Sequence, residues 1–234
     1  MTIDLFPVKW VDSGLSLRRT SGPQDGVLAS TYCSRSGATR VFGMRKSKAE
    51  TAETRRRIIE VAAREFRRSG IHDAGLAEVM AAAGLTHGGF YRHFDGKEKL
   101  VTEALAAAME SILERADMAA HGRDGKSGLE AIVETYLAID HRDDRSGGCP
   151  LAGLGSELAR ADDENRAVAS AAIVRFLKLL MQQMPRRKSD AAQSKAIFLL
   201  SALVGAITLS RIVTDPELSV AILRETKRQL ANVS

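Results

Sequence analysis

"GLTHGGFYRHFDGKEKL", residues 84–100, carries the clearest indication of the fold. Gly84 follows a short apolar segment of helical character, and Thr86 offers a hydroxyl cap to the helix that comes next. Gly88 and Gly89 then cost about 1 kcal/mol each relative to alanine within a helix. The helix itself gives little reason for two glycines, so we interpret them as positions where an outside partner approaches the backbone closely.

The rest of the chain beyond Met44 is also helical in character, because Ala, Leu, Glu and Arg dominate, prolines are few and strand-like alternation is absent. The sequence therefore predicts an all-α protein. Turn residues and caps predict helices at residues 51–69, 76–83, 87–94, 96–119 with Asp95 as the cap, 129–140, 150–160, 164–184, 191–213 and 216–233.

Two short helices joined by residues 84–86, with a longer helix before them, form a helix-turn-helix pattern. The apolar positions expected to fill its small core are Val79, Ala83, Leu85, Phe90 and Phe94. Residues 45–68 add nine Lys or Arg against four Glu, a bias that favours a polyanionic partner. Turn, caps and charge together indicate a DNA-binding surface rather than a helical subdomain with incidental charge.

A recognition helix docks on DNA by its N-terminal residues, and donors around it fix its register on the phosphates. The candidate contacts are His87, Gly88 and Gly89 at base edges, and Tyr91, Arg92, His93 and Lys97 at phosphate oxygens. Two experimental signatures are expected to separate these groups: base contacts set sequence preference, while phosphate contacts set overall affinity and its salt dependence.

Residues 54–105, and above all "AAAGLTHGGFYRHFDGKEKL", resemble the DNA-binding domain of the TetR/AcrR family of one-component bacterial transcription regulators. The later segment "LLSALVGAITLSRIVTDPELSVAILRE" resembles the paired dimerisation helices of that family. The resemblance implies a homodimer, a palindromic operator in double-stranded DNA, and a C-terminal domain that receives a small-molecule or electrophile effector. It also implies a repressor, with a transcriptional activator of the same architecture as the alternative.

The resemblance also assigns roles to individual positions. Matches to the family's phosphate-contacting positions are Thr86, Tyr91, His93 and Lys97; matches to base-reading positions are His87, Gly88 and Gly89; matches to the basic arm of the minor groove are Arg45, Lys46 and Lys48. Gly75 departs from the family pattern, because Thr or Ser usually caps a helix there, and Met80 stands where alanine is common. Gly75 still serves as a weaker cap, which puts one phosphate contact in doubt.

The domain organisation follows from changes in composition. Residues 1–43 are rich in Ser, Gly and Thr without a sustained period, so we expect a disordered extension before a DNA-binding domain at 44–100 and a helical effector-binding and dimerisation domain at 101–234. The segment at 191–213 is the most apolar and is expected to be either an internal core helix or a dimer interface. We expect no signal peptide and no membrane span, and a cytoplasmic protein.

Cys149 is the second candidate site, in "RSGGCPLAGLGSEL". Pro150 suits the first position of a helix, so Cys149 falls at its N-cap, where the helix dipole and nearby His141, Arg142 and Arg145 favour a thiolate. Some TetR-like regulators that answer electrophiles or oxidants resemble this segment. Cys149 is then either a reactive sensor or a small buried residue that closes a ligand pocket, and the sequence leaves both open.

Other readings have weaker support. Candidates for a pocket in the C-terminal half are Tyr136, Glu157, Phe176, Met181 and Met184. A nucleophile elbow, a phosphate loop, an HExxH run and a Cys/His metal pattern are all absent from the sequence, so we expect neither an enzyme, a cofactor nor a metal site. A helical protein-interaction module without DNA binding remains the alternative from another functional class.

Overall fold

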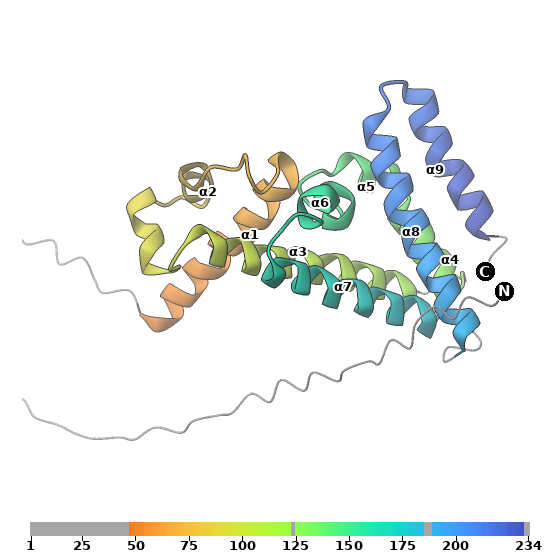
Figure 1. Cartoon of the computed structure of the whole chain (residues 1–234), viewed down its shortest axis with the longest axis horizontal. Helices are drawn as coiled ribbons and strands as arrows, with labels where there is room; N and C mark the ends of the chain where they lie inside the picture. Colours follow the sequence, from red (N-terminus) through yellow and green to blue (C-terminus); the bar gives the residue numbers. More distant parts are fainter. Residues whose placement is uncertain (1–46, 123–124, 185–188, 232–234) are drawn as a thin grey trace, which may run out of the picture. The chain divides into compact units, whose positions relative to one another are not determined.

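The structure is a computed structural model, and it describes residues 47–122, 125–184 and 189–231 (Figure 1). Within these residues every regular element is a helix, which confirms the predicted all-α class. The elements are α1 Lys48–Ser69, α2 Leu76–Ala82, the 3₁₀ helix η1 His87–Arg92, α3 Lys97–Ala120, α4 Gly128–Tyr136, α5 Ile139–Asp143, α6 Pro150–Leu158, α7 Asp163–Gln182, α8 Asp190–Ile212 and α9 Pro216–Ala231. The extension predicted at 1–43 lies outside the described residues.

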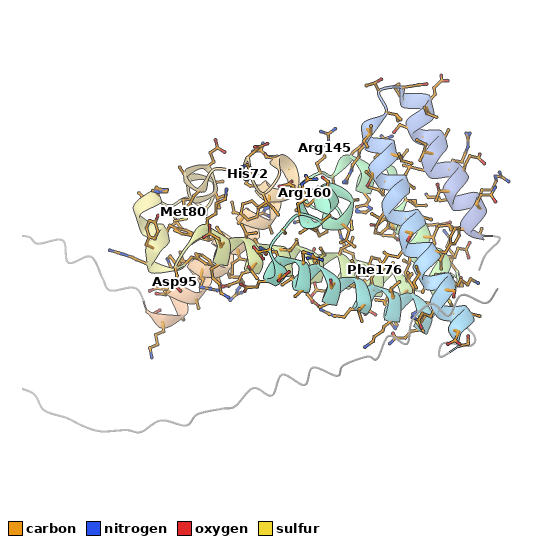
Figure 2. The ribbon with its side chains drawn as sticks, viewed as in Figure 1. His72, Met80, Asp95, Arg145, Arg160 and Phe176 are labelled. Atoms are coloured by element: carbon orange, nitrogen blue, oxygen red, sulfur yellow. The ribbon has the colours of Figure 1, made fainter. Side chains whose placement is uncertain are left out.

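Two hydrophobic clusters organise these helices. The first joins α1, α2, η1 and the start of α3 around fully buried residues such as Met80 and Phe90. The second joins the rest of α3 to α4 and the later helices around Leu203 and Phe176. Figure 2 labels Phe176. The domain boundary predicted at residue 100 falls inside α3, which contributes Leu100 to the first cluster and other residues to the second.

The helix ends show which local signals act. α1 begins at Lys48 rather than at residue 51, because Ser47 and Glu50 form a capping box: the Ser47 N–H donates to Glu50 Oε2 at 2.6 Å and the Glu50 N–H to Ser47 Oγ at 3.1 Å. α3 has Gly96 at its N-cap, so the expectation that Asp95 caps this helix is wrong. Gly75 does cap α2 without a side-chain bond, as predicted.

The single helix predicted at 129–140 is also wrong, since α4 ends at Tyr136 and α5 begins at Ile139. The carbonyl oxygen of Tyr136 bonds with Nδ1 of His141 at 2.5 Å, a side-chain contact that satisfies a C-terminal carbonyl of α4. Neither Gly nor Pro stands at the break, so the sequence carries no local sign of it.

α8 has a buried apolar face, as an internal core helix requires, and an exposed apolar face besides. Leu203 and Ile207 are fully buried in the second cluster, whereas Ile197, Phe198 and Ile212 of the same helix are exposed. α9 packs along α8 (Figure 1) and adds exposed apolar side chains of its own. By length and composition alone α8 is apolar enough to cross a membrane, which corrects the expectation that no segment has this property, although core helices of soluble proteins share it.

Candidate nucleic-acid interface and ligand cavity

The turn between α2 and η1 is closed by backbone bonds. The Leu85 N–H donates to Met80 O and the Gly84 N–H to Ala81 O, both at 2.9 Å, and Gly84 has φ +70°. This is a Schellman motif with glycine at its left-handed position, where a side chain would be strained. Gly84 therefore has the structural role that the sequence predicted for it.

The helix after the turn differs from its prediction. Residues 87–92 form a 3₁₀ helix instead of an α-helix at 87–94, with i→i+3 bonds such as Gly89 N–H to Thr86 O at 3.0 Å. Two adjacent glycines disfavour a regular α-helix, which is the physical reason for the difference. Thr86 occupies the N-cap position, but its hydroxyl makes no capping bond, so that part of the prediction is wrong.

Packing within the chain does not require glycine at 88 or 89. A Cβ added at Gly88 meets no atom within 4 Å, and one added at Gly89 meets only Thr86 Oγ1 at 3.8 Å and Met80 Cε at 3.9 Å. Both residues have negative φ values, since the positive-φ glycines of the described residues lie elsewhere. Gly88 is exposed and its open space faces outward, as a close-approach surface requires, whereas the half-buried Gly89 has ordinary contact distance to the core residue Met80.

Three donor side chains surround this open space. His87, Tyr91 and Arg92 are exposed, Tyr91 by 66%, and across residues 47–122, 125–184 and 189–231 their polar atoms make no hydrogen bond or ion pair. Tyr91 is nevertheless oriented, because its ring packs edge-on against the buried ring of Phe90, with 5.2 Å between centroids. The fold thus positions Tyr91, and all three donors remain available to an external partner.

Lys97 is held differently from the other candidates. Its Nζ donates to Ala74 O at 2.9 Å and to His72 O at 3.4 Å, which ties the start of α3 to the loop before α2. A phosphate contact by Lys97 remains a prediction that must coexist with this internal role. Lys48 is exposed on the first turn of α1, whereas Arg45 and Lys46 lie outside the described residues.

Arg55 was missed as a supporting residue of this surface. Its guanidinium lies 4.5 Å from the centroid of Phe94, donates to the carbonyl of His93 at 3.3 Å, and pairs with Glu103 at 2.5 Å. Arg55 thus fixes the exit of η1 to both α1 and α3. Its role was not visible in the sequence because its partners lie 38 and 48 residues away.

Cys149 lies at the N-cap of α6 with Pro150 at the first turn, as predicted, but its environment does not favour a thiolate. The residue is 1% exposed, and burial raises the pKa of the thiol. The Cys149 N–H donates to Nε2 of His141 at 3.0 Å. Nε2 is therefore the acceptor and Nδ1 carries the proton that goes to Tyr136 O, so His141 is the neutral tautomer.

Burial also lowers the pKa of His141, with Arg115 and Arg211 adding to the effect. The positive charge that we expected His141 to lend the thiol is thus absent, and the predicted stabilisation of the thiolate is wrong. The burial of Cys149 agrees with the alternative interpretation of a small buried residue, but that it closes a ligand pocket stays a prediction. The Arg142 side chain is directed to Asp143 and Ser219 and does not contribute either.

Residues 139–149, here called the arginine-held loop, are fixed by arginines from three helices. Arg67 of α1 donates from Nη1 to Gly148 O at 3.1 Å, and Arg115 of α3 donates from Nη2 to Gly147 O. Arg211 of α8 completes the set with bonds to His141 O at 2.9 Å, Arg142 O at 2.8 Å and Asp144 O at 3.3 Å. The loop therefore connects the DNA-binding helices to the rest of the molecule.

A cavity of about 500 Å³ lies next to this loop. It is lined by Ile112, Arg115, Ala116, Ile132, Thr135, Tyr136, Ala138, Asp140, His141 and Asp144. Of the pocket candidates from the sequence, Tyr136 does line this cavity. Glu157 lines another one at the α1–α2 junction, where its Oε2 accepts from the Ile71 N–H at 2.9 Å, while Phe176 and Met184 belong to the core.

Known proteins share both the DNA-binding helices and the overall fold. Residues 58–104 match the family model for bacterial regulatory proteins, tetR family. The chain is 34% identical over 88 residues to the HTH-type transcriptional repressor KstR2 of Rhodococcus jostii (strain RHA1), a match that covers 37% of this chain and 43% of that protein. It is 28% identical over 175 residues to the HTH-type transcriptional repressor BepR of Brucella suis biovar 1 (strain 1330), covering 69% and 82%.

The crystal structure of a TetR transcriptional regulator from Chloroflexus aurantiacus J-10-FL resembles this fold with a TM-score of 0.67 at 26% identity, over 79% of this chain and 95% of that one. Fold and surface thus define a helix-turn-helix protein of the bacterial one-component type. Its DNA-binding helices match the TetR family of bacterial regulatory proteins, and the fold of the later helices resembles that of a TetR regulator. Its match spans less than half the length of KstR2. The relatives that it matches are regulators by name, in agreement with the expectation of a non-enzyme.

Proposed function

We propose that this protein is a sequence-specific transcription repressor that binds a palindromic operator as a homodimer in the cytoplasm. The observation that carries the proposal is the surface of η1, where Gly88 leaves open space beside three exposed donors whose polar atoms have no partner within the described residues. A helical module that only bound other proteins would not need donors around an open backbone. An activator of the same architecture remains the alternative.

The division of labour follows from position on this surface. Phosphate contacts position a protein on DNA, whereas contacts to base edges specify the sequence. The base-reading group is His87, Gly88 and Gly89; the phosphate group is Thr86, Tyr91, Arg92, His93 and Lys97; the arm toward the minor groove is Arg45, Lys46 and Lys48.

The second copy of the chain is expected on α8 and α9. Side chains that remain exposed there are Ile197, Phe198, Leu209, Ile212, Leu218 and Val220. An apolar face of this kind across two adjacent helices is expensive to leave in water and is typical of an interface between subunits. The DNA-binding helices of the two subunits, held about one turn of DNA apart, then match the two half-sites of a palindrome.

Release from the operator is assigned to a small molecule in the cavity beside the arginine-held loop. One conformation of the dimer holds the DNA-binding helices of its two subunits at a spacing that does not fit the operator. A ligand that binds this conformation more tightly shifts the population toward it and so lowers operator affinity. Modification of Cys149 is the other release signal to consider, although the thiol is buried and its pKa raised. An electrophile that acts equally on wild type and Cys149→Ser would exclude it.

The test is a gel-shift titration on the DNA upstream of the protein's own gene, at several salt concentrations. We expect affinity to fall steeply with salt, because phosphate binding releases counterions. His87→Ala should change sequence preference at one base position by about 1–3 kcal/mol, whereas Lys97→Ala should weaken all sequences alike. Equal losses on every sequence for both variants would contradict this division, and binding without a salt slope would contradict DNA as the partner.

A further inference from the structure

We propose that the cavity beside the arginine-held loop takes an apolar compound with a hydrogen-bond acceptor oxygen, which Tyr136 and Arg115 bind together. The inference rests on the proposed function and specifies the chemistry of the effector site. It stands on two polar groups of the same cavity wall whose hydrogen bonds are incomplete, in a pocket that is otherwise mostly apolar.

Tyr136 is the first of these groups. Its side chain is 3% exposed, and its hydroxyl makes no hydrogen bond of normal geometry within the described residues, although the buried Cys149 thiol lies within reach as a weak hydrogen-bond partner. Burial raises the pKa of Tyr136 well above its usual value, so the phenol keeps its proton and can donate. A buried hydroxyl that has only a weak partner costs free energy, which a bound oxygen acceptor would recover.

Arg115 is the second group. Its Nη2 donates to Gly147 O, but its buried Nε–H has no partner within the described residues. A guanidinium can only donate hydrogen bonds. The two groups of this cavity wall whose hydrogen bonds are incomplete therefore both need an acceptor atom from the ligand. Ile112, Ala116 and Ile132 supply the apolar wall for the rest of the ligand.

The other polar groups of the cavity do not compete for the same atom. Asp144 accepts the Gly147 N–H at 2.6 Å, and His141 is engaged at both ring nitrogens. Asp140 is exposed and contributes a negative charge. Its charge and that of Asp144 oppose a carboxylate while Arg115 favours one, so either a carboxylate or a neutral carbonyl can supply the acceptor.

Arg115 also makes this site regulatory, because ligand and loop share one guanidinium. An acceptor in the cavity draws Arg115 toward the ligand and weakens its bond to Gly147. The next residue, Gly148, is bound by Arg67 of α1. Occupancy of the cavity is thereby transmitted to the first helix of the DNA-binding domain, with Arg67 acting as a positioning residue rather than a ligand contact.

Calorimetry on the purified full chain without DNA tests the ligand chemistry. The probes are benzoate, acetophenone and ethylbenzene, which share a ring and differ in the acceptor. We expect at least one acceptor probe to bind about five- to tenfold more tightly than ethylbenzene, the value of one added hydrogen bond. If benzoate binds most tightly, the acceptor is a carboxylate; if acetophenone binds most tightly, it is a neutral carbonyl.

Tyr136→Phe and Arg115→Met should each remove this preference while ethylbenzene binding stays unchanged. Tyr136→Phe loses only a hydroxyl whose partner within the chain is at most the weak Cys149 thiol, so it is expected to fold about as well as wild type. Three results would each overturn the proposal. They are ethylbenzene binding as tightly as both acceptor probes, a preference for the acceptor that survives both substitutions, and no binding of an acceptor probe at about 10 mM.

A gel shift with the preferred probe tests the transmission, with Arg67→Gln compared with Arg64→Gln, an exposed arginine one turn earlier on the same helix. Arg67→Gln should keep probe binding and lose the effect of the probe on DNA, whereas Arg64→Gln should keep both. An unchanged response in Arg67→Gln would overturn the route through the loop. Probe binding by a protein that binds no DNA would retain the ligand site and reject the proposed repressor.

Discussion

Two regions of the molecule differ in whether their polar groups have hydrogen-bond partners within the protein. They are the reading head, residues 76–92, and the arginine-held loop, residues 139–149. In the head, the backbone closes its own turn and the donors of His87, Tyr91 and Arg92 are left unbonded within the described residues. In the loop, backbone carbonyls are bound by side chains from three distant helices. Groups without internal partners indicate a surface built for an external one, whereas satisfied groups indicate a joint that holds the molecule together.

The two regions also use glycine for different reasons. Gly88 in the head has no neighbouring atom within 4 Å of an added Cβ, while the same Cβ at Gly148 would lie 2.5 Å from Asp144 O and 2.6 Å from Arg211 Nη2. Glycine at 148 is therefore required by packing within the chain. Glycine at 88 is not, so substitutions at the two positions should separate binding from stability.

The largest expected effect is that of Gly88→Glu on DNA binding. The added carboxylate projects from open space toward the phosphates, and we expect operator affinity to fall by about 100-fold or more. The free energy of unfolding should change by less than about 0.5 kcal/mol. Gel shifts and urea denaturation measure the two quantities, with Ala171→Glu on an exposed turn of α7 as the charge control. A protein that unfolds instead would place Gly88 among the structural glycines.

Gly148→Ala should have the reverse profile. The clash with a backbone carbonyl and with Arg211 is expected to lower the free energy of unfolding by about 1–3 kcal/mol. Gly155→Ala is the matched control, because Gly155 lies in α6 with no atom near an added Cβ, and alanine should stabilise that helix by about 0.5–1 kcal/mol. Equal stability of the two variants would show that the loop adjusts freely and is not a rigid joint.

The smallest expected effect is the contribution of His141 to the pH dependence of stability. Its folded pKa lies below the unfolded value of about 6.5, so the unfolded chain binds the proton more tightly. The contribution of His141 is complete above that value and is lost as the pH falls toward the folded pKa. The slope is at most about 1.4 kcal/mol per pH unit.

Urea denaturation at pH 7.5 and pH 5.5 measures this difference. We expect His141→Gln to show a smaller loss between the two pH values than wild type, although it is less stable at pH 7.5. His72→Gln, which changes an exposed histidine, should follow the wild type. An identical loss in His141→Gln and wild type would mean that folding does not change the pKa of His141.

The sequence predicted the head far better than the loop, and the reason is distance along the chain. Gly84, Thr86 and the Cys149-Pro150 helix entry act within a few residues, so their positions could be predicted even where details such as the Thr86 cap were wrong. Arg67 and Arg115 reach carbonyls 81 and 32 residues away, and no periodicity encodes such a contact. The break after α4 was missed for another reason: no Gly or Pro marks it, and the side chain that bonds to the Tyr136 carbonyl comes from the next helix.

α3 has a mechanical consequence for the whole protein. Its 24 residues form one uninterrupted helix from Lys97, beside the head, past Arg115, at the cavity. The 18 residues between these two positions rise by about 27 Å, so a tilt of about 10° at the cavity moves the Lys97 end by about 5 Å. Half-sites on DNA repeat every turn of about 34 Å, so in the proposed dimer two subunits that each swing by such an amount would no longer reach both grooves at once. If a ligand in the cavity acts as proposed, α3 would work as a lever, and its length would set how small a movement at the cavity is enough to release the operator.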